Sequence, residues 1–227
     1  MHKNYFRDVI VERPALFAAM LRFNGVSADG DAATPPDGLA YFRDLLPESC
    51  LEELWRHPAS RKHLRNLLAP LTPGPDGPFW DFSEESRCLA LLEPATLDEL
   101  ALFYGASLHA PEIARTIMGK DIARLREALG ERAHAYAMQR GQYRMPAGRD
   151  SFAARNAGMS LAERVVLHGR EALGIIVAGW PQALQHRIRA TAPEDVAVSD
   201  NLRRGVWFDL KQLLLREVAP AWAPCFA

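Results

Sequence analysis

Cysteine, lysine and long apolar runs are scarce in this sequence of 227 residues. The three cysteines, Cys50, Cys88 and Cys225, lie far apart and form no Cys-x-x-Cys pair, so we expect a reducing compartment and no disulfide framework. Arginine supplies most of the 27 basic residues, and 28 acidic residues balance them to a formal net charge of −1. The total charge therefore gives no electrostatic reason to expect nucleic acid or an anionic membrane as a partner.

No stretch of the sequence has the pattern of a membrane helix. The longest uncharged stretch, residues 172–186, is interrupted by Pro181 and is shorter than the roughly 20 apolar residues that a spanning helix needs. The first residues, MHKNYFRDVIVERP, carry charges throughout and have no apolar core, so we expect no secretory signal. These features predict a soluble cytoplasmic protein.

Motifs of known catalytic or ligand-binding chemistry are also missing. The seven histidines form no His-Glu-x-x-His motif, no spacing of cysteine and histidine fits zinc, and no glycine-rich loop matches a phosphate cradle. His109 stands between two helical stretches with no second histidine near it in the sequence, so we interpret it as a structural turn residue. We therefore predict that the protein is not an enzyme, with no catalytic, cofactor or metal site.

Gly158-Met159-Ser160 resembles part of the nucleophile elbow of a hydrolase. That motif needs a second glycine after the serine and a strand before it, and the sequence pattern supplies neither. Ser160 and Glu163 fit a capping box instead, in which the two side chains accept hydrogen bonds from each other's backbone N–H at the start of a helix. We rank a hydrolase that uses Ser160 last among the functional hypotheses.

Helical periodicity is what the sequence does contain. The composition, 48% hydrophobic and 24% charged, is that of a globular protein. Residues 84–140 repeat apolar side chains at helical spacing, and Thr96-x-x-Glu99 fits a further capping box. Within this stretch, Gly105 would let another backbone approach closely because it has no side chain. Residues 205–210, GVWFDL, could form either a short strand or part of a helix.

These patterns predict an all-α fold, in the form of a compact multi-helix orthogonal bundle with long Pro/Gly loops. We expect residues 1–227 to form a single helical domain. Proline, glycine and polar residues predict a flexible linker over about 27–38 and loops over about 69–78 and 142–158. The last helix is expected over 200–218.

One local cluster of basic residues, WRHPASRKHLR at 55–65, allows three interpretations. Its arginines and tryptophan could follow a phosphate backbone and stack on a base, form a solvated helix face, or dock a protein partner. PFWDF at 78–82 adds aromatic rings that either cover the core or anchor a partner. The candidate protein-interface residues on these grounds are Trp55, Arg56, Arg61, Arg65, Phe79 and Trp80.

Residues 89–138 carry a series of motifs: a leucine-rich LALLEP entry, then LALFYGASLHAP, then IMGKDIARLREALG, then AHAYAM. LRFN at 21–24 is a further short motif near the N terminus. The series resembles the YscK/SctK family, the cytoplasmic accessory proteins of the bacterial type III secretion sorting platform. Two departures stand out: LRFN is followed by Gly25 and a polar linker where the family has a proline-containing tryptophan segment, and residues after 142 match only in helical character.

The resemblance implies a non-enzymatic adapter without a cofactor, and it carries over no catalytic residue. Family members connect the cytoplasmic domain of the inner-membrane ring protein to the C-ring-like pod protein, which carries the ATPase complex. For this chain the resemblance implies the same two partners, no nucleic acid, no direct membrane insertion, and a cytoplasmic location peripheral to the inner membrane through those partners. The alternative is a helical nucleic-acid-binding protein that uses the basic cluster at 55–65.

Overall fold

The computed structural model describes the chain as two compact units. The described residues are 5–24, 47–57, 60, 79–185, 188, 190, 192–194, 196 and 198–226. The first unit, here called the N-terminal unit, comprises Met1–Ser83 with Gln182–Arg187, and the second, the main unit, comprises Glu84–Pro181 with Ile188–Ala227.

The linker expected at 27–38 and the loop expected at 69–78 lie outside the described residues, so both stay predictions. The expectation that residues 1–227 fold as a single domain stays a prediction.

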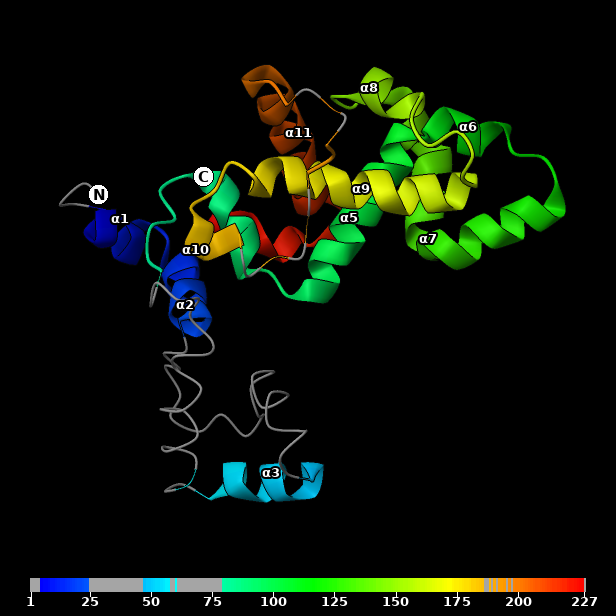
Figure 1. The fold of residues 1–227 in the computed structure, drawn as a ribbon. Coiled ribbons are helices and arrows are strands. Elements are labelled where there is room, and N and C mark those ends of the chain that lie inside the picture. The colour runs from blue at the N-terminus through cyan, green and yellow to red at the C-terminus, as the bar shows by residue number, and fades with distance from the viewer. Residues whose placement is uncertain are drawn as a thin grey trace. The chain divides into compact units, whose positions relative to one another are not determined.

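Every regular element of the described residues is helical (Figure 1), which confirms the all-α prediction. The N-terminal unit contains α1 (Tyr5–Glu12), α2 (Pro14–Phe23), α3 (Glu48–Arg56) and α10 (Gln182–Gln185). The main unit contains η2 (Glu85–Leu91), α5 (Pro94–Leu108), α6 (Ala110–Arg115), α7 (Gly119–Gln139), η3 (Gly141–Tyr143), α8 (Arg149–Ala153), α9 (Leu161–Val177), α11 (Asp200–Leu213), η4 (Leu214–Val218) and η5 (Pro220–Cys225). None of the helices in the described part of the chain combines the length and the apolar character required to cross a bilayer.

Asn24 ends α2 and ties it to a segment far along the chain. Its side-chain amide nitrogen donates hydrogen bonds to the carbonyl oxygens of Met20 (2.9 Å) and Phe79 (2.8 Å). Its side-chain oxygen accepts a hydrogen bond from the backbone N–H of Phe79 at 2.8 Å. The amide thus satisfies both backbone groups of Phe79, and Phe82 then packs edge-on against Phe23.

Helices α5 and α9 form the centre of the main unit, where they pass close to each other (Figure 1). A Cβ atom placed on Gly105 would lie 2.0 Å from the carbonyl oxygen of Val165, and one placed on Gly169 would lie 2.0 Å from the carbonyl oxygen of Ala101. The two helix backbones therefore touch at positions where no other residue fits. This confirms the prediction that Gly105 permits a close backbone approach.

The start of α5 differs from the predicted capping box at Thr96 and Glu99. The helix begins earlier, at Pro94 after the N-cap residue Glu93, because proline is well suited to the first turn of a helix. Thr96 consequently lies inside the first turn, and the side chain of Glu99 pairs with Arg132 instead. The Thr96–Glu99 capping box was therefore wrong.

The capping box at the start of α9 is confirmed. The backbone N–H of Glu163 donates to Oγ of Ser160 at 3.3 Å, and the backbone N–H of Ser160 donates to Oε2 of Glu163 at 2.8 Å. The hydroxyl of Ser160 also donates to the same carboxylate at 2.7 Å. Ser160 is therefore a helix cap.

Further predictions concern the loop at 142–158 and the last helix. The stretch 142–158, expected as a loop, contains the short helix α8. Residues 205–210 lie within α11, so the helical alternative is correct, and the helix expected over 200–218 is α-helical to Leu213 and continues as the π turn η4. Gly130 adopts φ 72°, a conformation that favours glycine, and kinks α7.

We expect Gly105→Ala to lower the free energy of unfolding by about 3 kcal/mol, because the new methyl group meets backbone that cannot move aside as a side chain can. Chemical denaturation followed by circular dichroism measures this change. Gly119→Ala is the matched control, since nothing lies within 4 Å of its Cβ position, and it should stay within about 0.5 kcal/mol of the wild type. Equal unfolding curves for the two variants would contradict the close crossing.

We expect Ser160→Ala to lower the free energy of unfolding by about 1 kcal/mol through the loss of the helix cap. The same denaturation measurement applies, with the exposed Ser151→Ala as control. A Ser160→Ala protein as stable as the Ser151→Ala protein would show that the cap contributes nothing.

Candidate functional site

The six residues proposed from sequence as a docking surface are only partly described. Trp55 in α3 is 3% exposed and offers almost no surface to a partner, and Arg56 beside it is exposed and pairs with Glu52 at 3.4 Å. Phe79 and Trp80 are half-buried. Arg61 and Arg65 lie outside the described residues, so the docking role of the whole set stays a prediction.

His109, which sequence reasoning treated as isolated, is half of a buried histidine pair. It ends α5, begins α6, and places its Nε2 atom 2.8 Å from Nδ1 of His168 in α9. The exposed fractions of His109 and His168 are 1% and 0%. Nδ1 of His109 lies 3.1 Å from Oε1 of Glu112, and Nε2 of His168 lies 3.2 Å from Oδ1 of Asn156.

Sequence reasoning missed both partners of His109, for different reasons. Glu112 follows His109 by three residues, a spacing that places the two side chains on neighbouring turns of a helix, so this partner could have been found. Glu112 is also paired with Arg164, which links α6 to α9. His168 lies far along the chain, and only the packing of α5 on α9 brings it to His109.

Burial lowers the pKa of His109 below its ordinary value of 6.5, and the hydrogen bond with Glu112 opposes that shift only in part. The neutral ring then donates from Nδ1 to Glu112 and accepts at Nε2 from the Nδ1–H of His168. This leaves a lone pair on Nε2 of His168. The side-chain amide of Asn156 can donate an N–H to that lone pair. If the histidine pair gains a proton, the amide oxygen can accept a hydrogen bond from it instead.

All four ring nitrogens of the histidine pair thus face protein groups. None is left to hold a substrate or a metal ion, and the arrangement connects the α5–α6 turn to α9. The geometry agrees with the interpretation of His109 as a structural turn residue. Among the described residues, no group of three or more histidine, cysteine, aspartate or glutamate side chains could hold a metal ion.

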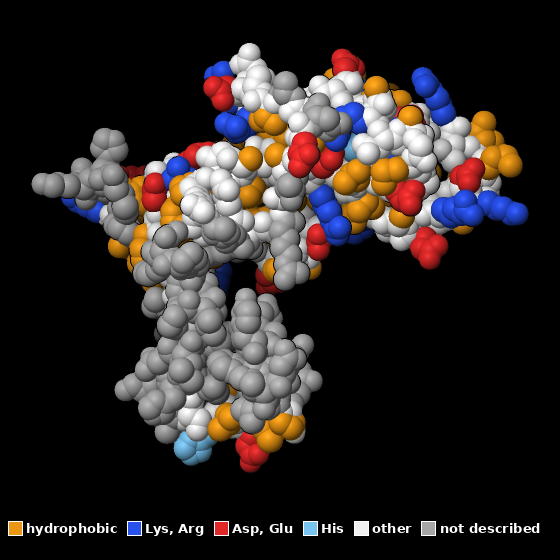
Figure 2. Space-filling view, in the orientation of Figure 1, with side chains coloured by type: hydrophobic (Ala, Val, Ile, Leu, Met, Phe, Trp, Pro, Cys, Tyr) orange, Lys and Arg blue, Asp and Glu red, His pale blue; other side chains and the backbone are white. Residues whose placement is uncertain are grey.

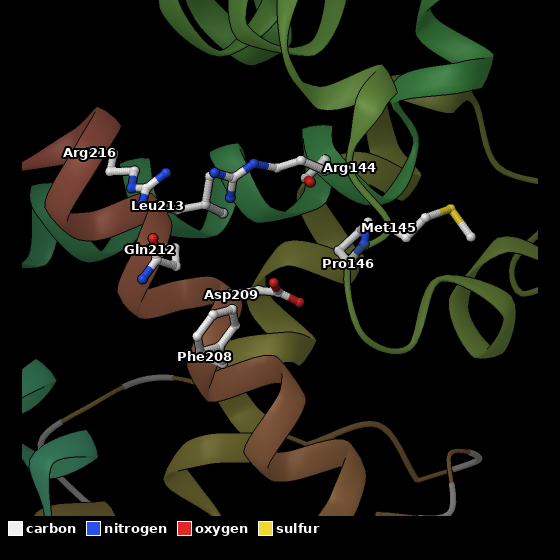
Figure 3. A pocket seen from close by; sticks show the side chains of 9 residues that line it. Arg144, Met145, Pro146, Phe208, Asp209, Gln212, Leu213 and Arg216 are labelled. Atoms are coloured by element: carbon white, nitrogen blue, oxygen red, sulfur yellow. The ribbon is translucent and has the colours of Figure 1, made fainter.

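A surface pocket of about 310 Å³ lies elsewhere in the main unit, between the 144–146 segment and α11 with η4 (Figure 3). Arg144 and Met145 come from the segment, and Phe208 and Asp209 come from α11. Arg216 of η4 completes the charged part of the lining. Figure 3 shows the side chains of Arg144 and Arg216 extended toward each other from opposite sides.

Two part-buried hydrogen bonds fix the wall of this pocket. Oδ2 of Asp209 accepts the backbone N–H of Ala147 at 2.8 Å, and the hydroxyl of Tyr104 in α5 donates to the carbonyl oxygen of the same residue at 2.8 Å. Burial raises the pKa of Asp209, while the hydrogen bond from Ala147 and the charge of Arg144 act in the opposite direction. The Asp209 carboxylate is therefore used to hold the segment in place.

A second hollow of about 350 Å³ adjoins the pocket and shares Met145 and Pro146 with it. It continues along α11 to Ser199 and Leu202. Arg149 in its wall donates to the carbonyl oxygens of Ser107 (3.1 Å) and Arg144 (2.6 Å), which fastens the 144–149 turn to α5. The pocket and the hollow, which share Met145 and Pro146 in their linings, are together called the α11 groove.

Comparison with known proteins gives no match. No protein-family model matches the chain, and neither a curated protein sequence nor a solved structure is significantly similar to it. The structure by itself therefore defines the class: an all-α protein whose main unit presents the α11 groove.

Acid should destabilise the protein through the histidine pair. Unfolded His109 takes up a proton near its ordinary pKa of 6.5, whereas the folded ring stays neutral to lower pH, so this stability is present above pH 6.5 and is lost as the pH falls below it. We expect the free energy of unfolding to fall from about pH 7.5 to about pH 5, and less steeply in His109→Gln.

Denaturation curves at a series of pH values measure this slope. His57→Gln, in an exposed position of the N-terminal unit, is the control and should keep the wild-type slope. His134, whose pKa is also lowered by burial, contributes equally to all three proteins. An identical slope in His109→Gln and the wild type would show that His109 does not titrate as described.

Proposed function

We propose that this chain is a non-enzymatic adapter of the bacterial type III secretion sorting platform. In this role it links the cytoplasmic domain of the inner-membrane ring protein to the C-ring-like pod protein, and it needs no cofactor. It would act in the cytoplasm, at the inner membrane only through its partners. The observation that carries the proposal is the resemblance of residues 89–138 to the YscK/SctK family.

Residues of the motifs that carry the resemblance make several of the contacts between helices of the main unit. Within LALFYGASLHAP, Gly105 permits the crossing of α5 and α9, and Tyr104 holds the wall of the α11 groove through Ala147. His109, in the same motif, connects α5 to α9 through His168. These residues shape the helical scaffold, so the resemblance supports a common scaffold more than a common chemistry. A scaffold of this kind suits an adapter.

The α11 groove gives the adapter a surface on which a partner could dock. Met145 and Phe208 are 78% and 62% exposed, and Arg144 and Arg216 lie beside them. Methionine, aromatic residues and arginine are enriched where protein partners meet. Large exposed apolar side chains that flank a concave surface are typical of interaction sites.

The alternative function, nucleic-acid binding through the cluster at 55–65, gains no support from the described residues. Arg61 and Arg65 lie outside them, and Arg56 is paired with Glu52. On the face of the molecule seen in Figure 2, the described basic side chains lie among acidic ones. Nucleic acid instead favours a basic stripe on one face.

Co-purification tests the adapter function. We expect the affinity-tagged chain to retain the cytoplasmic domain of the ring protein and the pod protein when each is expressed with it. A tagged helical protein of similar size and charge is the control. Failure to retain either candidate partner at micromolar concentration and low salt would overturn the proposal.

A further inference from the structure

Arg144 and Arg216 differ from several arginines of the main unit, whose guanidinium groups form ion pairs with carboxylates. Four arginines of the main unit pair with carboxylates across helices or turns: Arg132 with Glu99, Arg140 with Glu217, Arg155 with Glu171 and Arg164 with Glu112. The guanidinium groups of Arg144 and Arg216 have no ion pair or hydrogen bond with another of the described residues. Figure 3 nevertheless shows them directed toward each other over the pocket.

Two guanidinium groups that point toward each other repel, and an anionic group between them would remove that repulsion. Guanidinium is shaped to bind carboxylate or phosphate through paired N–H donors. Asp209 lines the same pocket and its charge interacts with that of Arg144, but no ion pair or hydrogen bond joins its carboxylate to either arginine, and its Oδ2 atom accepts the N–H of Ala147. The pocket therefore offers an anion site that the main unit itself leaves unfilled.

Two exposed apolar side chains, Phe208 and Met145, line the pocket together with polar side chains such as Gln212. Met145 lines both the pocket and the adjoining hollow. A flexible methionine and an aromatic ring in one lining can pack against apolar side chains of varied shape. An occupant that fits this lining carries apolar groups as well as a negative charge.

The α11 groove has room for an extended occupant. The two hollows, of about 310 Å³ and 350 Å³, share Met145 and Pro146 in their linings, and the lining of the second includes Ser199, the N-cap of α11. A single small anion would occupy only the end between the arginines. The charge of the pocket is also modest, since Asp209 offsets one of the two arginines, and this disfavours a polyanion such as nucleic acid.

We propose that the α11 groove binds a segment of a partner protein in which an aspartate or glutamate is adjacent to large apolar residues. The carboxylate lies between Arg144 and Arg216, and the apolar side chains pack against Phe208 and Met145. This inference deepens the proposed adapter function and rests on it for the biological partner. The recognition itself is a property of the groove.

Selection from a phage-displayed library of random peptides on the full-length chain tests the groove directly. We expect the selected peptides to carry Asp or Glu next to Leu, Phe or Met. The same selection on a protein with both Arg144→Gln and Arg216→Gln should lose this preference. Selected peptides without carboxylates, or the same preference on both proteins, would overturn the inference.

Titration calorimetry with the strongest selected peptide, made synthetically, provides the quantitative test. Arg144→Gln and Arg216→Gln should each raise its Kd by about tenfold or more, and so should Glu→Gln in the peptide. Arg124→Gln, at an exposed position on α7, is the matched control and should leave Kd unchanged. Phe208→Ser tests the apolar contact without removing a charge and should also weaken binding.

Two further probes separate other occupants. Inorganic phosphate that binds between the arginines while no peptide is selected would reduce the site to one for a small anion, and would overturn the inference. A labelled single-stranded oligonucleotide that binds through the same arginines while no peptide is selected would do so as well. Failure of co-purification alongside a successful peptide selection would refute the adapter function and leave the groove intact.

Discussion

The close crossing of α5 and α9 is the constraint on which the rest of the main unit depends. Gly105 and Gly169 each face a carbonyl oxygen of the opposite helix, so the two backbones touch with no side chain between them. That contact fixes how far α6 lies from α9, which in turn sets the histidine pair at hydrogen-bond distance. It also fixes Tyr104, whose hydroxyl holds Ala147 and with it one wall of the α11 groove.

The main unit uses its polar groups in two different ways. In the interior, the ring nitrogens of the buried histidine pair find partners in each other, in Glu112 and in Asn156, as buried polar groups generally do. At the α11 groove, two guanidinium groups without an ion pair line a pocket that also contains exposed apolar side chains. Burial accounts for the first arrangement, and the proposed binding of an acidic segment would account for the second.

Sequence could predict what depends on neighbours along the chain. The fold class, the capping box at Ser160 and the need for Gly105 all follow from local spacing. Local spacing also gave one wrong prediction. Thr96 and Glu99 fit a capping box, but α5 starts earlier, at Pro94, so Thr96 lies inside the helix. The histidine pair and the α11 groove join residues far apart in sequence, so only the helix packing could bring them together.

The proposed adapter role requires this chain to join the ring protein to the pod protein. The most direct measurement is the mass of the complex formed when the chain, the cytoplasmic domain of the ring protein and the pod protein are mixed, by light scattering after size exclusion. The account predicts one complex that contains all three, and no complex of ring and pod proteins when the chain is left out. Association of those two proteins to the same extent without the chain would contradict it.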